Sequence, residues 1–106
     1  MTRQTTQRYE AYAGVLKAMA HPSRLLIIDA LAAREHCVCE LAALVGANMP
    51  TVSKHVALLK QAGIVGVRKQ GTRSYCTLKC PCVMQFMKCI TAVVRARAKE
   101  HMALVA

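Results

Sequence analysis

The sequence predicts a mostly α-helical chain of about five helices with one small β-hairpin. Apolar residues recur at spacings of three and four over most of the chain, as they do on the buried face of a helix. Glycine and proline divide this pattern into short segments, and one segment near residue 70 instead has β-prone residues on both sides of a glycine. The chain has 106 residues, of which 55% are hydrophobic, so we expect a single domain over residues 1–106.

Two helices are expected before residue 34. The first spans Gln7–Ala20 and is broken at His21 and Pro22. Pro22 suits the first position of the second helix, Pro22–Ala33, because its φ is already helical and an N–H would have no partner there. The apolar residues of these two helices that we expect in the core are Tyr12, Val15, Leu16, Met19, Leu25, Leu26, Ile28 and Leu31.

A short third helix is expected after the polar connector Arg34–His36. It begins at about Cys37 or Cys39 and ends with Val45, since Gly46 can take the left-handed conformation that closes a helix.

The fourth helix, Met49–Gln61, has Asn48 as a good N-cap. Ala42, Gly46 and Val52 have the spacing of a helix-turn-helix. Such a motif needs a small residue where the two helices cross, a glycine in the turn and an apolar anchor on the second helix. The fourth helix would then be the recognition helix, whose N-terminal half enters the major groove of DNA.

The segment Ile64–Leu78 is expected to form a two-stranded hairpin with its turn at Gln70 and Gly71. A cationic hairpin directly after a helix-turn-helix is typical of a wing that lies along the phosphate backbone. The predicted fold is therefore a winged helix-turn-helix. The basic residues of the wing, which suit phosphate contacts better than base readout, are Arg68, Lys69 and Arg73.

The last helix, Val83–Val105, carries a longer apolar stripe than a chain of this size can easily cover. We therefore expect a homodimer with a C-terminal dimerisation helix over about 82–105, because winged proteins that bind palindromic DNA are two-fold. The alternative is that the stripe packs on the first helix of the same chain. The stripe consists of Val83, Phe86, Met87, Ile90, Val93, Val94 and Met102.

Positive charge is concentrated in the second half of the chain. The net charge is +10, and Leu41–Lys99 holds ten basic residues and no acidic ones, which is the pattern of a protein that binds a polyanion. Anionic lipid is a weaker candidate, since the basic residues are scattered over helices and hairpin. With three Tyr, one Phe and no Trp, the chain lacks the aromatic faces that bind single strands. Double-stranded operator DNA is the expected partner.

Several other classes of function are not indicated. No stretch approaches the ~18 apolar residues of a membrane span, and the first ten residues are polar, unlike a signal peptide. We therefore expect a cytoplasmic protein with no membrane partner. The sequence contains no glycine-rich phosphate loop, no His-Glu-x-x-His motif and no plausible acid–base pair of carboxylates, so neither an enzyme nor a small organic substrate is indicated.

Five short motifs occur in order within residues 10–80: His21–Leu25 (HPSRL), Cys37–Leu41 (CVCEL), Thr51–His55 (TVSKH), Leu59–Gly63 (LKQAG) and the wing from Arg68 to Tyr75. In these motifs the chain resembles the winged-helix repressors of the ArsR/SmtB family. The resemblance implies a homodimer that represses its own operon and leaves the operator when an inducer binds.

Four residues on the exposed face of the recognition helix are candidates for DNA contacts: Thr51, Ser53, Lys54 and His55. Hydroxyl groups can bind either kind of base pair, and Lys54 can take a phosphate or a guanine edge. Two alternatives stay open, because Ser53 can bond back to its own helix and His55 can be a packing residue.

Cys37 and Cys39, two of six cysteines, are the main candidates for an inducer site. Cytoplasmic cysteines are mostly reduced, and a helix N-terminus favours the thiolate, which is both metal ligand and nucleophile. The resemblance implies the same role, since arsenic- and cadmium-sensing members use a Cys-x-Cys here as inducer ligands. Some members add a cysteine three residues on, where this chain has Ala42. The alternative is two small side chains buried at a helix start.

A three-thiolate site needs one further ligand. We expect Cys80, Cys82 or Cys89 to supply it, because ligation would then join the helix-turn-helix to the dimer helix and could change the spacing of the recognition helices. A separate local cluster of Cys76, Cys80 and Cys82 is the second arrangement.

The ligand type restricts the inducer. A thiolate-only site suits As(III), Sb(III) or another thiophilic ion such as Cd(II), Pb(II) or Cu(I), and no cofactor is expected for DNA binding itself. Family zinc sensors carry carboxylates and histidines on the last helix, where this chain has only Glu100 and His101, so zinc is not expected there. A thiol-based redox or persulfide sensor of the same fold is the alternative, with a bridge between Cys37 or Cys39 and a C-terminal cysteine.

Overall fold

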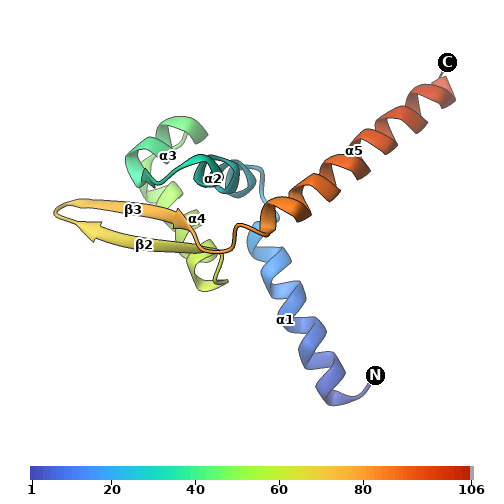
Figure 1. Ribbon diagram of the computed structural model, residues 1–106, viewed down its shortest axis with the longest axis horizontal. Coiled ribbons are helices and arrows are strands. Elements are labelled where there is room, and N and C mark those ends of the chain that lie inside the picture. Colours follow the sequence, from blue (N-terminus) through green and yellow to red (C-terminus); the bar gives the residue numbers. More distant parts are fainter. Residues whose placement is uncertain (106) are drawn as a thin grey trace.

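Figure 1 shows the computed structural model of the chain, in which residues 1–105 are described. Helices α2, α3 and α4 and a small sheet form the packed part of the molecule, from which α1 and α5 project as separate arms. The elements are α1 (Arg3–Met19), α2 (Pro22–Ala33), β1 (His36–Cys37), α3 (Val38–Val45), α4 (Met49–Gln61), β2 (Val65–Gln70), β3 (Arg73–Leu78) and α5 (Val83–Val105). This is the predicted winged helix-turn-helix with five helices.

Local signals at the N-termini of α1 and α2 explain where these helices begin. Thr2 caps α1 by accepting a 3.1 Å hydrogen bond from the Thr5 amide, so α1 begins before the predicted Gln7. Helix α2 has the predicted bounds. Its N-cap is His21, whose Nδ1 accepts a 3.0 Å hydrogen bond from the Ser23 amide.

The helix-turn-helix is formed by α3 and α4, as predicted. Gly46 closes α3 in the left-handed conformation at φ 75°, which glycine adopts without steric cost. Asn48 caps α4, its Oδ1 accepting a 2.9 Å hydrogen bond from the Thr51 amide. Ala42 and Val52 are both buried, the small residue on α3 and the apolar anchor on α4.

The sheet has three strands in the order β1-β3-β2, one more than the predicted two-stranded wing. The additional strand β1 is antiparallel to β3, and its His36 and Cys37 lie opposite Cys76 and Tyr75. Two residues are too few to show the alternation that predicts a strand. Pairing with a segment distant in the sequence therefore determines this strand.

The wing turn lies one residue later than predicted. Gln70 pairs with Arg73, so the two turn residues are Gly71 and Thr72. Gly71 has φ 62°, the positive value that a tight hairpin turn requires.

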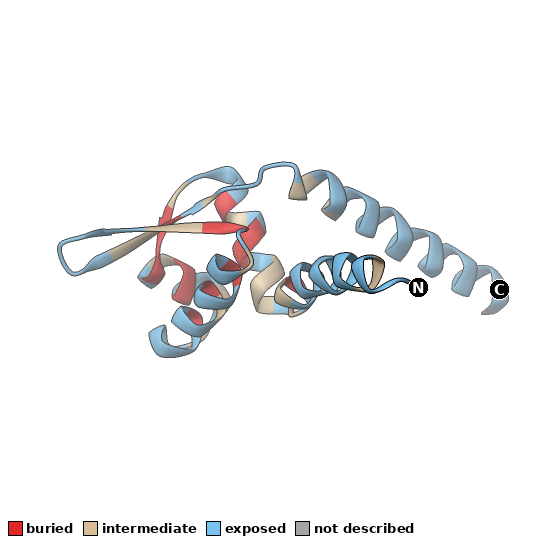
Figure 2. Ribbon diagram, turned by 90° about the horizontal axis from the view of Figure 1, so that it is seen from below, coloured by how far each residue is buried: buried red, intermediate tan, exposed pale blue. Residues whose placement is uncertain are grey.

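The core, red in Figure 2, includes the inner face of α4, where the predicted anchor Val52 is buried together with Val56 and Leu59. Two predictions for the other helices are wrong. On α2, Leu26 is 41% exposed while Ile27 is buried, because Ile27, Ile28 and Leu31 form its inner face. On α1 only Met19 is buried, since the rest of the helix projects beyond the core. The predicted core residues of α1 that are exposed are Tyr12, Val15 and Leu16.

Helix α5 leaves most of its apolar stripe uncovered. Phe86, Ile90, Val93, Val94 and Met102 are exposed, and α1 and α5 point in different directions in Figure 1. The stripe is therefore not packed against α1 of the same chain. Among residues 1–105, no helix combines the length and apolar composition needed to cross a membrane.

Candidate DNA interface and thiol site

The outer face of α4 is available for contact with DNA. Thr51, Ser53 and Lys54 are exposed, while Val52 and Val56 on the opposite side hold the helix against the core. The capped N-terminus of α4 therefore presents two hydroxyls and one ammonium group on a helix that the core fixes in place.

His55, the fourth candidate on α4, lies in a half-buried cluster with two residues of the α2 N-terminus. Its Nδ1 is 3.2 Å from Nη1 of Arg24, and its ring centroid is 4.5 Å from that of His21. Burial lowers the pKa of His55, and the nearby His21 and Arg24 lower it further. The structure thus places His55 in a contact between helices, the packing role that its sequence position left open. In the sequence, Arg24 is part of the His21–Leu25 motif, which gave it no individual role.

The three basic residues of the wing differ in their surroundings. Arg68 forms a 2.7 Å ion pair with Glu35, and its guanidinium lies 5.0 Å from the centroid of the Tyr75 ring. Lys69 and Arg73 are exposed, and neither forms an ion pair within residues 1–105. Lys69 and Arg73 therefore offer unneutralised charge to a phosphate backbone, whereas the charge of Arg68 is balanced by an acid.

Cys37 is the N-cap of α3. Its Sγ accepts a 3.4 Å hydrogen bond from the Glu40 amide, and Glu40 Oε1 accepts a 3.1 Å hydrogen bond from the Cys37 amide. This is a capping box with cysteine in place of serine or threonine. Glu40 also forms a 2.8 Å ion pair with Arg34, which together with the Cys37 amide lowers the pKa of that carboxyl. The Cys-x-x-Glu spacing is the sequence signal for this box.

The sulfur atoms of Cys37 and Cys39 lie side by side and are joined as a disulfide, with the two Cα atoms 5.4 Å apart. Cys37 is buried and Cys39 is exposed. Both line a cavity of about 340 Å³ that we call the thiol cavity. Its other lining residues come from α3, α4, the wing turn and β3, and are Val38, Met49, Ser53, Thr72, Arg73 and Ser74. The cavity thus brings the cysteine pair together with two candidate DNA contacts, Ser53 and Arg73.

The other cysteines are not gathered around this pair. Cys76 is buried in the sheet, and burial together with the charge of Glu35 raises the pKa of its thiol to about 11. Cys80 donates a 3.6 Å hydrogen bond to the carbonyl of Gly63, and Cys82 and Cys89 are exposed. Within the described residues, no three His, Cys, Asp or Glu side chains are grouped closely enough to hold a metal ion. One chain therefore assembles two thiols and neither of the predicted three-thiolate arrangements.

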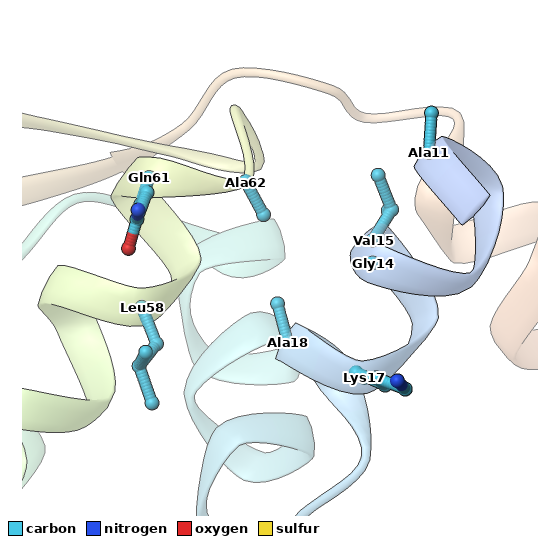
Figure 3. A pocket seen from close by; sticks show the side chains of 8 residues that line it. All are labelled: Ala11, Gly14, Val15, Lys17, Ala18, Leu58, Gln61 and Ala62. Atoms are coloured by element: carbon cyan, nitrogen blue, oxygen red, sulfur yellow. The ribbon is translucent and has the colours of Figure 1, made fainter. Parts of the chain in front are cut away.

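A larger open groove of about 500 Å³ lies between α1 and the end of α4 (Figure 3). Small and apolar side chains form most of its wall, including Ala11, Val15, Ala18 and Leu58. Lys17 is its one ionisable lining residue, and no thiol reaches it. The groove therefore lacks the groups that would bind a soft ion.

The sequence matches the family model described as bacterial regulatory protein, arsR family, over residues 21–67. An HTH-type transcriptional regulator of Methanocaldococcus jannaschii is 40% identical over 70 residues, which are 65% of this chain and 79% of that protein. The arsenical resistance operon repressor of Staphylococcus xylosus is 35% identical over 65 residues, 61% of this chain and 62% of that repressor.

Two solved structures share the fold over most of the chain. NolR from Sinorhizobium fredii superposes with a TM-score of 0.79 at 30% identity, covering 88% of this chain and 93% of NolR. The homodimeric winged helix-turn-helix DNA-binding domain of a Mycobacterium bovis protein superposes with a TM-score of 0.72 at 32% identity, covering 96% of this chain and 91% of that domain.

Proposed function

The chain is a DNA-binding transcriptional regulator of the ArsR family, and we propose that it is a homodimeric repressor which leaves its operator when a soft metal or metalloid ion binds Cys37 and Cys39. The observation that carries this proposal is the thiol cavity, because it joins the cysteine pair to Ser53 on α4 and Arg73 on the wing. A ligand bound there acts directly on residues that face DNA.

The DNA-binding part of the proposal rests on α4 and the wing. Thr51, Ser53 and Lys54 lie on the exposed face of α4, where a recognition helix presents side chains to base edges in the major groove. Lys69 and Arg73 add exposed positive charge on the hairpin, where they can neutralise phosphates.

The dimer is supported by the uncovered stripe of α5. Exposed Phe86, Ile90 and Val93 form an apolar face that a second copy can cover, and the Mycobacterium bovis domain of similar fold is described as homodimeric. A two-fold dimer would present two copies of α4 to half-sites one helical turn apart, about 34 Å.

The inducer class follows from the sulfur ligands. In the reducing cytoplasm the pair is a dithiol, and two thiolates bind thiophilic ions such as As(III), Sb(III) or Cd(II) much better than hard ions. Cys37 also caps α3, the first helix of the helix-turn-helix. An ion bound to its sulfur therefore changes the bonding at the start of the helix that supports α4.

A redox sensor is the second candidate, favoured by the bond between Cys37 and Cys39 in the structure. Hydrogen peroxide would oxidise the dithiol to this disulfide, passing two electrons to the peroxide, and the two thiol protons would leave in two water molecules. The bridge would then lie within the Cys-x-Cys rather than between it and a C-terminal cysteine.

One experiment separates the two candidates. The reduced protein is bound without oxygen to a fluorescent duplex taken from upstream of its own gene, and As(III), Cd(II) or peroxide is added. We expect As(III) or Cd(II) to release the protein from the duplex with reductant present. Release by peroxide alone, reversed by dithiothreitol, would instead assign the redox function.

A further inference from the structure

We propose that the thiol cavity binds a monosubstituted trivalent arsenical or antimonial, with the metalloid on Cys37 and Cys39 and its organic substituent inside the cavity. This inference rests on the proposed function, since it uses the same two thiols, and it names the class of ligand that they take. A ligand with an organic substituent is one that the sequence did not indicate.

The first argument is the number of sulfur ligands. Trivalent arsenic forms three bonds, so inorganic arsenite bound to two thiolates keeps a hydroxyl group as its third ligand, whereas an arsenical with one carbon substituent completes its three bonds with two thiolates. Cys37 lies opposite Tyr75 on β3. From Tyr75 the strand runs ~10 Å further to its end at Leu78, and Cys80 follows two residues later. Cys80 is held at Gly63, at the base of the wing. The described part of one chain therefore supplies the two sulfurs that the organic ligand requires.

The binding reaction needs no oxidant or reductant. In the hydrated arsenical, arsenic carries one carbon group and two hydroxyl groups. Two As–S bonds form to Cys37 and Cys39 as two As–O bonds break. Each hydroxyl leaves with one thiol proton as water, so two waters are released and arsenic stays trivalent. Exposed Cys39 is the sulfur that reacts first, and buried Cys37 closes the ring.

The cavity beside the sulfurs can hold the substituent. Its volume of about 340 Å³ is within the range of pockets that bind small organic molecules. Met49 and Arg73 line it, and thioether sulfur and guanidinium groups both contact aromatic rings favourably. The chemistry of the wall therefore favours an aryl substituent over a methyl group.

Occupancy of the cavity and binding of DNA should exclude each other. Ser53 and Arg73 line the cavity, and both face the side of the molecule proposed to contact DNA. An aryl group among these side chains takes up space that a DNA backbone beside Arg73 requires. Release would then arise from local competition at the start of α4.

The test compares three ligands on the reduced full-length protein without DNA. Phenylarsonous acid, methylarsonous acid and arsenite are titrated by calorimetry, and native mass spectrometry counts the bound ligands. We expect one phenylarsenic group per chain, with affinity falling from phenyl to methyl to arsenite. Met49→Ala should lower the affinity for phenylarsonous acid about five- to tenfold, as expected for loss of one sulfur–aromatic contact. The affinity for methylarsonous acid should stay unchanged. Leu44→Ala, an exposed position on α3 outside the cavity, is the control.

Three results would overturn the inference. Arsenite binding as tightly as phenylarsonous acid, and weakened by Cys80→Ser, Cys82→Ser or Cys89→Ser, would assign a three-thiolate site and leave the proposed function standing. An unchanged phenyl preference in Met49→Ala would place the substituent outside the cavity. Full phenylarsonous acid binding by the Cys37→Ser/Cys39→Ser double variant would contradict both the inference and the proposed function.

Discussion

Arg24 on α2 is hydrogen-bonded to His55 on α4, with Nη1 and Nδ1 3.2 Å apart. The same guanidinium donates a 3.4 Å hydrogen bond to the carbonyl of Lys17 at the end of α1. Arg24 thereby connects α1, α2 and α4, the proposed recognition helix, through one side chain.

Acid should weaken this connection. The pKa of His55 in the fold lies below its ordinary value of 6.5, because of burial and then His21 and Arg24, so the unfolded chain binds more protons as the pH falls. The contribution of neutral His55 to the free energy of unfolding is complete above its ordinary pKa of 6.5. This contribution is lost as the pH falls through the lower pKa that His55 has in the folded protein. Urea unfolding between about pH 7.5 and about pH 5 should show this loss. The loss should be smaller in His55→Gln, and equal pH dependence in the two proteins would refute the assignment.

The two wing arginines should differ in their contribution to DNA binding. Arg73→Ala should weaken binding to all sequences alike and reduce the slope of log K against log salt by ~2 per dimer, one phosphate from each chain. Arg68→Ala should have a smaller effect, because Glu35 already balances that charge. Anisotropy titrations at four salt concentrations measure both slopes. Equal effects of the two substitutions would show that the Glu35 pair opens on DNA.

Helix α5 should carry the dimer. Ile90→Asp places a carboxylate within the exposed apolar stripe, which would be desolvated in a dimer interface. We expect monomers by sedimentation velocity and poor operator affinity, with the helical circular dichroism signal retained. Glu100→Gln on the same helix is a control outside the stripe. A stable dimer of Ile90→Asp would assign dimerisation to another surface.

The capping role of Cys37 predicts a difference between two substitutions. Serine is a strong N-cap, so Cys37→Ser should keep the bond from the Glu40 amide and preserve the free energy of unfolding. Cys37→Ala removes the acceptor and should cost ~1 kcal/mol. Chemical denaturation of both reduced variants measures the difference. Equal stability would mean that the sulfur contributes no net capping energy.

The parts of the fold that were predictable from the sequence are those where a single residue decides local structure. Pro22 and Asn48 set the starts of α2 and α4, and Gly46 ended α3, because each acts within one turn of its own position. Strand β1 and the pair of Arg68 with Glu35 depend on segments more than 30 residues apart. No local pattern contains that information.

In the candidate site too, features set by neighbouring residues were predictable, and features set by distant segments were not. The Cys-x-Cys was identifiable because its two members are near in sequence and sit at a helix start. Its neighbours Met49, Thr72 and Arg73 come from α4 and the wing turn, which only the tertiary fold brings to the cysteines. The sequence left the third thiolate open for the same reason, since the position of Cys80 depends on how β3 pairs with β1 and on its contact at Gly63.

Anaerobic titration of the operator complex with As(III), read by fluorescence anisotropy in the presence of reductant, tests most directly whether Cys37 and Cys39 control release. The wild type and the exposed-cysteine control Cys82→Ser should both release DNA at stoichiometric As(III). The Cys37→Ser/Cys39→Ser double variant should bind the operator with wild-type affinity and stay bound, because hydroxyl groups are poor ligands for soft ions. Release of the double variant at the same As(III) concentration as the wild type would contradict the assignment of sensing to this pair.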